Sequence, residues 1–168
     1  GNGVVIDPEA LLEEMRRLSG RGIDVRQAVK IADQAHVIFP YHKRLDVLEE
    51  ASRTGRLGTT GRGIGPCYVD KVARSGIRVA DLCNRAQFAQ RLKQAVAEKN
   101  RLFEALYHEP PISYDALLKQ YSGYADILAP HVVNSGRFLR EAIAQGKRLL
   151  FEGAQGTMLD IDHGTYPY

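Results

Sequence analysis

The stretch Arg148-Leu149-Leu150-Phe151, followed by Glu152-Gly153-Ala154-Gln155-Gly156-Thr157, decides the predicted fold. Leu149 to Phe151 is a continuous apolar run, the pattern of a strand covered on both faces in a parallel sheet. A glycine-rich loop directly after such a strand lies where α/β sheets place ligands. The stretch therefore predicts an α/β fold with a mostly parallel central sheet and a ligand loop at its edge.

The first half of the chain carries further strand and helix signals. Asp7-Pro8 predicts a helix start, because Asp is a favoured N-cap and proline fits the first helical turn. Pro40 opens a second predicted helix, which runs to about Arg53. Short apolar runs predict additional strands at 3–6, 29–32 and 36–39.

The second half reads as helical over most of its length, because apolar residues recur at a period near 3.6. Pro110-Pro111 ends a first long helix, and Ser113 is the predicted N-cap of a second. A third helix carries Val132 and Ile143 and closes at Gly146. We expect an α/β part at 1–83 with a phosphate loop at 53–78, an inserted all-helical subdomain at 84–146, and a return strand with a ligand loop at 147–168.

Composition limits the function classes. The 168 residues hold 23 Lys+Arg and 20 Asp+Glu, and a net charge of +3 does not point to nucleic acid by itself. No window approaches about 18 consecutive apolar residues, so we expect no transmembrane helix. Two cysteines without a CxxC pair, Cys67 and Cys83, favour packing roles and a reducing cytoplasm. The sequence starts without Met and stops after a loop pattern, so we expect a piece of a longer chain.

The loop Gly58-Thr59-Thr60-Gly61-Arg62-Gly63-Ile64-Gly65-Pro66 is the first candidate site. Glycines let backbone N–H groups approach an anion closely. Thr59 and Thr60 offer hydroxyl groups, and the guanidinium of Arg62 suits a phosphate. No Gly-Lys-Ser/Thr ends the loop, so it is not a Walker A sequence. A mobile surface loop is the alternative interpretation.

A basic run follows the loop. Lys71, Arg74 and Arg78 recur at three- and four-residue spacing, so a helical turn would align them on one side. Such a cluster suits a phosphate or a carboxylate. The alternative is a solvated basic face, or pairing with Asp70 and Asp81.

The C-terminal stretch offers polar candidates. Gln155 has the donors and the acceptor that a base edge requires. Asp160, Asp162 and His163 suit metal ligation or acid–base chemistry, but the aspartates fit turn caps as well and His163 could bind backbone carbonyls. The remaining histidines are expected to be structural or exposed: His36, His42, His108 and His131.

Taken together, three stretches resemble the adenylosuccinate synthetase family: 58–66 with Tyr68, Lys71 and Arg74; 151–157; and 160–168. Gly1-Asn2-Gly3-Val4-Val5 is also similar to that family, so the resemblance covers the whole chain. It implies a cytoplasmic, homodimeric, Mg²⁺-dependent ligase of purine synthesis. Such an enzyme uses GTP to join IMP and L-aspartate through 6-phosphoryl-IMP, and it takes neither nucleic acid nor a membrane as partner.

The resemblance also implies residue roles. Thr60 would bind the IMP 5′-phosphate, and Arg74 would reach the same phosphate from the partner subunit. Gln155 would face the 6-oxygen of IMP, and Leu159 would pack against the nucleotide. Lys71 is the one candidate catalytic residue, and we expect it to act by electrostatics or interface packing rather than as a base. Supporting contacts are expected from Thr59, Arg62 and Arg78.

This sequence departs from the family pattern in what it lacks. The family's N-terminal glycine-rich loop, with its catalytic aspartate and Mg²⁺ contacts, is absent, and so is the Gly-His element that supplies the catalytic acid. We therefore expect no metal ligand in this piece and no turnover by it alone.

Two other function classes stay open. The first is a non-catalytic module that binds RNA or polyphosphate through the basic glycine-rich loop, although Tyr68 is the one aromatic residue at 53–78 for base stacking. The second is a helical interaction domain at 84–146, for which Thr60→Val and Gln155→Ala would leave every activity untouched.

Overall fold

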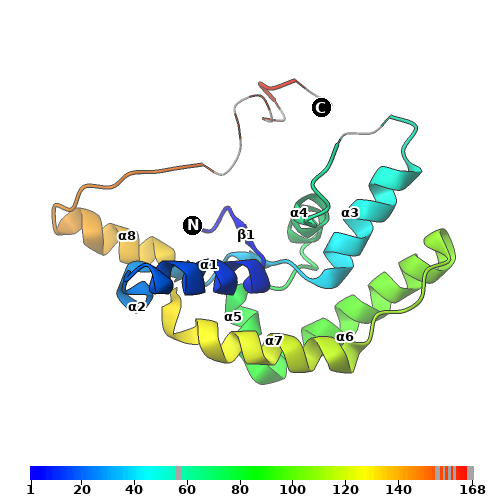
Figure 1. Ribbon diagram of the computed structural model, residues 1–168, viewed down its shortest axis with the longest axis horizontal. Coiled ribbons are helices and arrows are strands. Elements are labelled where there is room, and N and C mark those ends of the chain that lie inside the picture. Colours follow the sequence, from blue (N-terminus) through cyan, green and yellow to red (C-terminus); the bar gives the residue numbers. More distant parts are fainter. Residues whose placement is uncertain (56–57, 154–155, 157, 159, 161, 166–168) are drawn as a thin grey trace.

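The structure, a computed structural model, describes residues 1–55, 58–153, 156, 158, 160 and 162–165 (Figure 1). Its strands form two parallel pairs: β1 (Val5–Ile6) lies beside β3 (His36–Val37), and β2 (Ile31–Ala32) lies beside β4 (Val132–Val133). The predicted α/β class with parallel strands is therefore confirmed. The strands predicted in the first half are present at their expected places, although each is only two residues long.

The register of β3 brings a third segment to the same sheet. Val5 lies opposite His36 on one side of β3, while the backbone of His36 forms an antiparallel bridge with Arg78 on the other. The N–H of Val37 donates to the carbonyl oxygen of Ile77 at 2.9 Å. Arg78 is therefore attached to the edge of the sheet.

Two helices of the first half begin where the sequence predicts. The Asp7 carboxylate accepts hydrogen bonds from the N–H groups of Glu9 and Ala10, and Pro8 occupies the first helical position. Pro40 begins the next long helix, as predicted. The helices of this half are α1 (Pro8–Gly20), α2 (Val25–Ala28), α3 (Pro40–Ser52), α4 (Ile64–Val72) and α5 (Val79–Leu82).

The second half contains a helical hairpin and a further helix. Ser113 caps its helix by accepting from the N–H of Ala116, as predicted. The first long helix ends in a π-helical turn, after which His108 adopts a left-handed conformation with φ 53°. The elements are α6 (Arg85–Leu102), the π-helical turn Phe103–Tyr107, α7 (Tyr114–Leu128), the 3₁₀ turn Ala129–His131 and α8 (Ser135–Ala144).

The prediction that Val132 belongs to the third helix is wrong. Val132 and Val133 form strand β4 instead, because the edge of β2 offers backbone partners: the N–H of Asp33 donates to the carbonyl oxygen of Val133 at 3.0 Å. The helix starts only after Asn134, whose side chain accepts from the N–H of Arg137. The helical segment 84–146 therefore contributes a strand to the α/β part.

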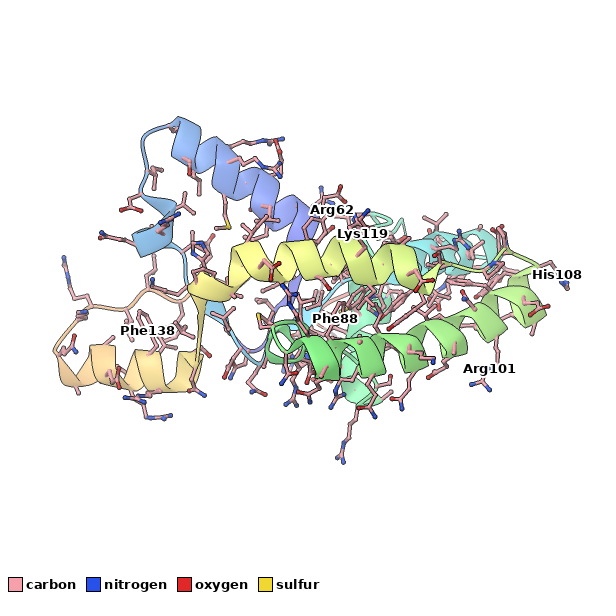
Figure 2. All side chains as sticks on the ribbon, turned by 90° about the horizontal axis from the view of Figure 1, so that it is seen from below. Arg62, Phe88, Arg101, His108, Lys119 and Phe138 are labelled. Carbon is pink, nitrogen blue, oxygen red and sulfur yellow. The ribbon has the colours of Figure 1, made fainter. Side chains whose placement is uncertain are left out.

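One core joins the two halves of the chain. The fully buried ring of Phe39 stacks on Tyr121 with ring centroids 4.4 Å apart, and Phe88 lies on another side of it at 6.2 Å. The Tyr121 hydroxyl donates to the carbonyl oxygen of Ile38 at 3.0 Å. Figure 2 shows Phe88 near the middle of the molecule, with His108 at the tip of the hairpin and Phe138 on α8 at the other end. The domain boundary at residue 84 stays a prediction.

The strand predicted at 148–151 is not formed. These residues carry neither helix nor strand, and Leu150 and Phe151 are 93% and 78% exposed. Figure 1 shows the chain leaving α8 as a single trace. An apolar run becomes a strand only where a neighbouring strand takes up its backbone hydrogen bonds, and the described residues place none beside it.

Across the described residues, no helix is both long and apolar enough to cross a membrane.

Candidate phosphate-binding site

The glycine-rich loop is attached to α3 at two points. The N–H of Gly58 donates to Glu50 Oε1 and the N–H of Gly63 donates to Asp46 Oδ2, both at 2.8 Å. Gly63 has φ 75°, and a Cβ atom there would lie 2.7 Å from the backbone nitrogen of Lys43. Only glycine allows this conformation and this close approach. Between the two attachment points lie three exposed side chains: Thr59, Thr60 and Arg62.

Helix α4 is attached to its surroundings through a buried carboxylate. Asp70 accepts from His42 Nε2 at 3.0 Å and from Lys99 Nζ at 2.6 Å, and all three side chains are buried. His42 Nδ1 accepts from the N–H of Phe39 at 3.0 Å, which places the ring proton on Nε2. This network links α3, α4 and α6.

The protonation states in the network follow from burial and partners. Burial lowers the pKa of His42, against the opposing effect of its hydrogen bond to Asp70, so the ring is neutral near pH 7. Burial alone would raise the pKa of Asp70, but hydrogen bonds from His42 and Lys99 outweigh it and the pKa is lowered. The network is therefore a neutral histidine, an ionised carboxylate and an ammonium group.

The basic run lines one pocket of about 410 Å³ at the end of α4. The structure brings Lys71, Arg74 and Arg78 together here, but the prediction that a helical turn aligns them is wrong. Helix α4 ends at Val72, and Arg78 lies at the edge of the sheet. Arg74 follows the helix in a left-handed conformation with φ 62°, and the N–H groups of Ser75 and Gly76 donate to the carbonyl oxygen of Asp70. The pocket is lined by His36, Lys71, Val72, Arg74, Gly76, Arg78, Asp81 and Arg91.

The two nearby carboxylates form no ion pair with this basic run. Asp70 is occupied by His42 and Lys99, and Asp81 pairs with Arg91 at 3.3 Å. Among the ion pairs between described residues, none includes the side chains of the run, so the alternative of pairing with Asp70 and Asp81 is not what the structure shows.

Two of the basic side chains have neutral partners instead. Lys71 Nζ donates to the carbonyl oxygen of Asn2 at 3.0 Å, and its ammonium group lies 5.6 Å from the ring centroid of Tyr68. Arg78 donates to the side-chain oxygen of Gln34 at 2.7 Å. Both cations keep their charge available to the pocket.

His36 closes the buried side of the pocket. A Cβ atom on Gly76 would lie 2.6 Å from its ring, so the loop after α4 passes directly over the histidine. Burial lowers the pKa of His36, and the charges of Lys71 and Arg78 lower it further. His36 therefore adds no positive charge near pH 7.

The threonine loop and the basic pocket lie at opposite ends of α4. The loop precedes the helix and the pocket follows it, and the residues that line the pocket do not include Thr59, Thr60 or Arg62. A nine-residue helix separates its ends by roughly 13 Å at 1.5 Å per residue. One phosphate group cannot bridge that distance within one chain.

The whole chain, residues 1–168, matches the sequence model of adenylosuccinate synthetase. The chain belongs to the adenylosuccinate synthetase family. It is 54% identical to the adenylosuccinate synthetase of Pelotomaculum thermopropionicum and 52% identical to that of Halothermothrix orenii, over 100% of this chain in each case. A structure described as fully ligated adenylosuccinate synthetase from Plasmodium falciparum superimposes on the whole chain with a TM-score of 0.89 and 32% identity.

The chain covers 39% of each of these relatives' lengths, and 39% of the Plasmodium chain. It therefore spans about two fifths of a family member.

The remaining candidates of this synthetase segment lie toward the C-terminus. Gln155 and Leu159 lie outside the described residues. Asp160 Oδ2 accepts from the N–H groups of Asp162 and His163 at 2.7 and 2.9 Å, which lowers the pKa of Asp160. Its role as a turn cap is therefore confirmed. In the part of the chain that the structure describes, no group of three or more His, Cys, Asp or Glu side chains could hold a metal ion.

The other histidines are structural or exposed and the cysteines have packing roles, as expected. His131 is buried and bonds to the carbonyl oxygen of Val29, while His108 is exposed. Burial raises the pKa of the Cys67 thiol to about 12, so it is not a reactive thiol. Cys83 packs against the core.

Sequence analysis missed the residues that hold the loop and α4 in place. Asp46, Glu50 and Lys99 were not among the candidates. A signal was present: His42, Asp46 and Glu50 recur every four residues in a predicted helix, which places three polar side chains on one face.

Proposed function

We propose that this chain is the central part of a GTP-dependent ligase that joins IMP and L-aspartate to form adenylosuccinate through 6-phosphoryl-IMP. Family membership supports the reaction class. The observation that carries the proposal is the loop 58–63, whose ends are fixed to α3 while two hydroxyls and a guanidinium stay exposed between them. This is the arrangement that a phosphate monoester requires.

Within this site, Thr60 binds the IMP 5′-phosphate, with Thr59 and Arg62 beside it. Gln155 faces the 6-oxygen of the base and Leu159 packs against the nucleotide. These roles follow from the family resemblance. The exposure of the three loop side chains supports the first part of the assignment.

Arg74 acts on the IMP phosphate of the partner subunit in a homodimer. The length of α4 supports this role, because it separates Arg74 from the threonine loop of its own chain by roughly 13 Å. Arg78 and Lys71 raise the positive potential around it.

Lys71 contributes to catalysis through its charge rather than as a base. Its ammonium group donates to the carbonyl oxygen of Asn2 at 3.0 Å and lies over the ring of Tyr68, contacts that suit a cation. The Tyr68 hydroxyl also donates to the carbonyl oxygen of Gly3 at 2.7 Å, and the two contacts together hold residues 2 and 3 against α4.

Mg²⁺ and GTP bind to parts of the enzyme other than the described residues of this chain. Mg²⁺ neutralises phosphate charge in phosphoryl transfer. Among the described residues, no group of three or more His, Cys, Asp or Glu side chains is gathered in one place. We expect this piece alone to be inactive, because the family's catalytic aspartate loop and Gly-His element are not in its sequence. The enzyme is cytoplasmic, which fits the two free cysteines, Cys67 and Cys83.

Binding measurements on the full-length enzyme test the phosphate site. Thr60→Val should weaken IMP binding about tenfold, the loss expected for one hydrogen bond to a charged group. Thr54→Val is the matched control, because Thr54 is also exposed but precedes the anchored loop 58–63, and this variant should bind IMP normally. Equal IMP affinity of the two variants would contradict the assignment. RNA binding that falls steeply with salt, without IMP binding, would favour the polyphosphate module instead.

Hybrid dimers test the role of Arg74 in the partner's site. An Arg74→Leu chain and a Gln155→Ala chain, each inactive in its own homodimer, should regain activity when mixed, because one of the two sites in each hybrid is intact. Random exchange restores about one quarter of all sites, since half of the twofold-symmetric dimers are hybrids. No recovery after verified subunit exchange would show that Arg74 acts within its own subunit.

A further inference from the structure

Three polar side chains form a row on one face of α3. His42, Asp46 and Glu50 are spaced four residues apart, so they lie one above the other along the helix. Each binds a different point of the segment that runs from the loop into α4. His42 Nε2 donates to Asp70 at 3.0 Å, Asp46 accepts from the N–H of Gly63 at 2.8 Å, and Glu50 accepts from the N–H of Gly58 at 2.8 Å.

Asp46 supplies an interaction that α4 lacks at its own start. Gly63 occupies the N-cap position of α4, and the third helical residue, Pro66, has no side-chain acceptor for the N–H of that glycine. Asp46 supplies this acceptor, a carboxylate from the neighbouring helix. Asp46 is itself only 7% exposed, so this hydrogen bond forms with little competition from water.

The same contacts define where the loop can lie. Gly58 and Gly63 are the two ends of a six-residue turn, and both are bonded to α3. The close packing of Gly63 on the backbone of Lys43 leaves that end no room to move toward α3. The threonine hydroxyls and the Arg62 guanidinium are therefore presented from two fixed points.

We propose that His42, Asp46 and Glu50 are positioning residues, which hold the loop 58–63 and α4 in the conformation that binds an anionic ligand. That this ligand is IMP rests on the proposed function. The row does not touch the ligand. Its carboxylates are beneath the loop and oppose an anion by their charge, so they act through hydrogen-bond geometry and not through attraction.

The proposed positioning role predicts different effects for amide and alanine substitutions. Asp46→Asn and Glu50→Gln keep an oxygen acceptor for the loop N–H groups and remove the unfavourable charge. Asp46→Ala and Glu50→Ala remove the acceptor. A purely electrostatic role would instead give amide and alanine variants the same effect.

Steady-state kinetics of the full-length enzyme are the first measurement. Asp46→Ala and Glu50→Ala should each raise the KM for IMP about tenfold, as for loss of a charge-assisted hydrogen bond. The amide variants should stay within about twofold of wild type, and the KM for GTP should be unchanged in all four. Glu49→Ala is the matched control, because it removes a neighbouring acid of α3 whose side chain makes no hydrogen bond to the described part of the loop.

The second measurement is amide hydrogen exchange at residues 58–63 without ligand. Exchange should be faster in both alanine variants than in wild type, the amide variants and Glu49→Ala, at similar melting temperatures. Glu50 is only half-buried, so Glu50→Ala carries the test if Asp46→Ala does not fold.

Three outcomes would decide the matter. Unchanged exchange with an unchanged KM for IMP would overturn the proposal, and so would an equal rise of KM for IMP and GTP. If wild type forms no adenylosuccinate but exchange still depends on Asp46 and Glu50, the proposed function fails while the positioning role stands.

Discussion

Two glycine-rich segments of this chain carry equally distinctive sequences but have very different surroundings. The loop 58–63 lies against α3 and is bonded to it at both ends. The segment 148–165 is exposed at every described residue except Gly164, and the contacts that order it are local, such as the turn closed by Asp160. A sequence motif indicates which ligand chemistry is available, whereas contacts with neighbouring elements determine whether the backbone of the motif is held in place.

The two segments differ in energy because only the first is linked to buried hydrogen-bond partners. It leads into α4, whose Asp70 shares a buried hydrogen-bond network with His42 and Lys99. In the second, the hydrogen bonds are exposed to water, which competes with each of them. We therefore expect substitutions in the first segment to affect stability and binding together, and substitutions in the second to leave stability unchanged.

Asp70→Ala should have the largest effect, because it leaves the Lys99 ammonium group buried without a counter-charge. The expected loss is about 3–5 kcal/mol of unfolding free energy in urea titrations of the full-length protein. The double variant Asp70→Ala/Lys99→Met should lose less than the single variant, since it removes the unpaired charge as well. A double variant that is less stable than Asp70→Ala would contradict this account.

Gly63→Ala should come second. Its φ of 75° and the 2.7 Å approach to Lys43 predict a loss of about 3 kcal/mol together with weaker IMP binding. Gly123→Ala is the control: it lies inside α7 with open space around its Cβ position, and alanine there should be neutral or stabilising by about 0.5–1 kcal/mol. Equal losses in both variants would show that the left-handed conformation is not required.

A pH titration of stability should give a smaller, graded effect. Burial lowers the pKa of His42 and of His36 below the usual 6.5, so the unfolded chain binds protons that the folded chain excludes. Stability is therefore complete above pH 6.5 and falls as the pH drops through the interval between 6.5 and the lowered values. His42→Asn should make this slope shallower in urea titrations at several pH values. An unchanged slope would mean that His42 titrates normally.

Asp160→Ala should have the smallest effect. Its carboxylate closes an exposed turn, so the melting temperature of the full-length protein should shift by no more than about 1 °C. A shift as large as that of Gly63→Ala would show that the second segment is anchored as firmly as the first.

Local signals predicted much of the fold. Asp7-Pro8, Pro40 and Ser113 mark helix starts through chemistry within three residues, and the structure confirms each of them. Strand β4 was missed and the strand at 148–151 is not formed, because both depend on a partner strand far away in sequence. A two-residue strand such as Val132–Val133 has no periodicity of its own to detect.

The candidate site was also only partly predictable from the sequence. The loop and the basic run were visible as composition and spacing, and the structure brings Lys71, Arg74 and Arg78 into one pocket. The buried partners were not visible, because His42 and Lys99 lie 28 and 29 residues from Asp70. Roles assigned to Thr60, Arg74 and Gln155 by family resemblance stay predictions until binding is measured.

The ammonium group of Lys99 has a consequence for how this region folds. It belongs to the helical hairpin, yet its counter-ion belongs to the helix that follows the loop 58–63. Undocking of the hairpin breaks this buried ion pair, so local opening of either element removes a contact of the other. Hairpin and loop should consequently unfold as one cooperative unit, and a ligand that orders the loop should protect amides of α6 that it never touches.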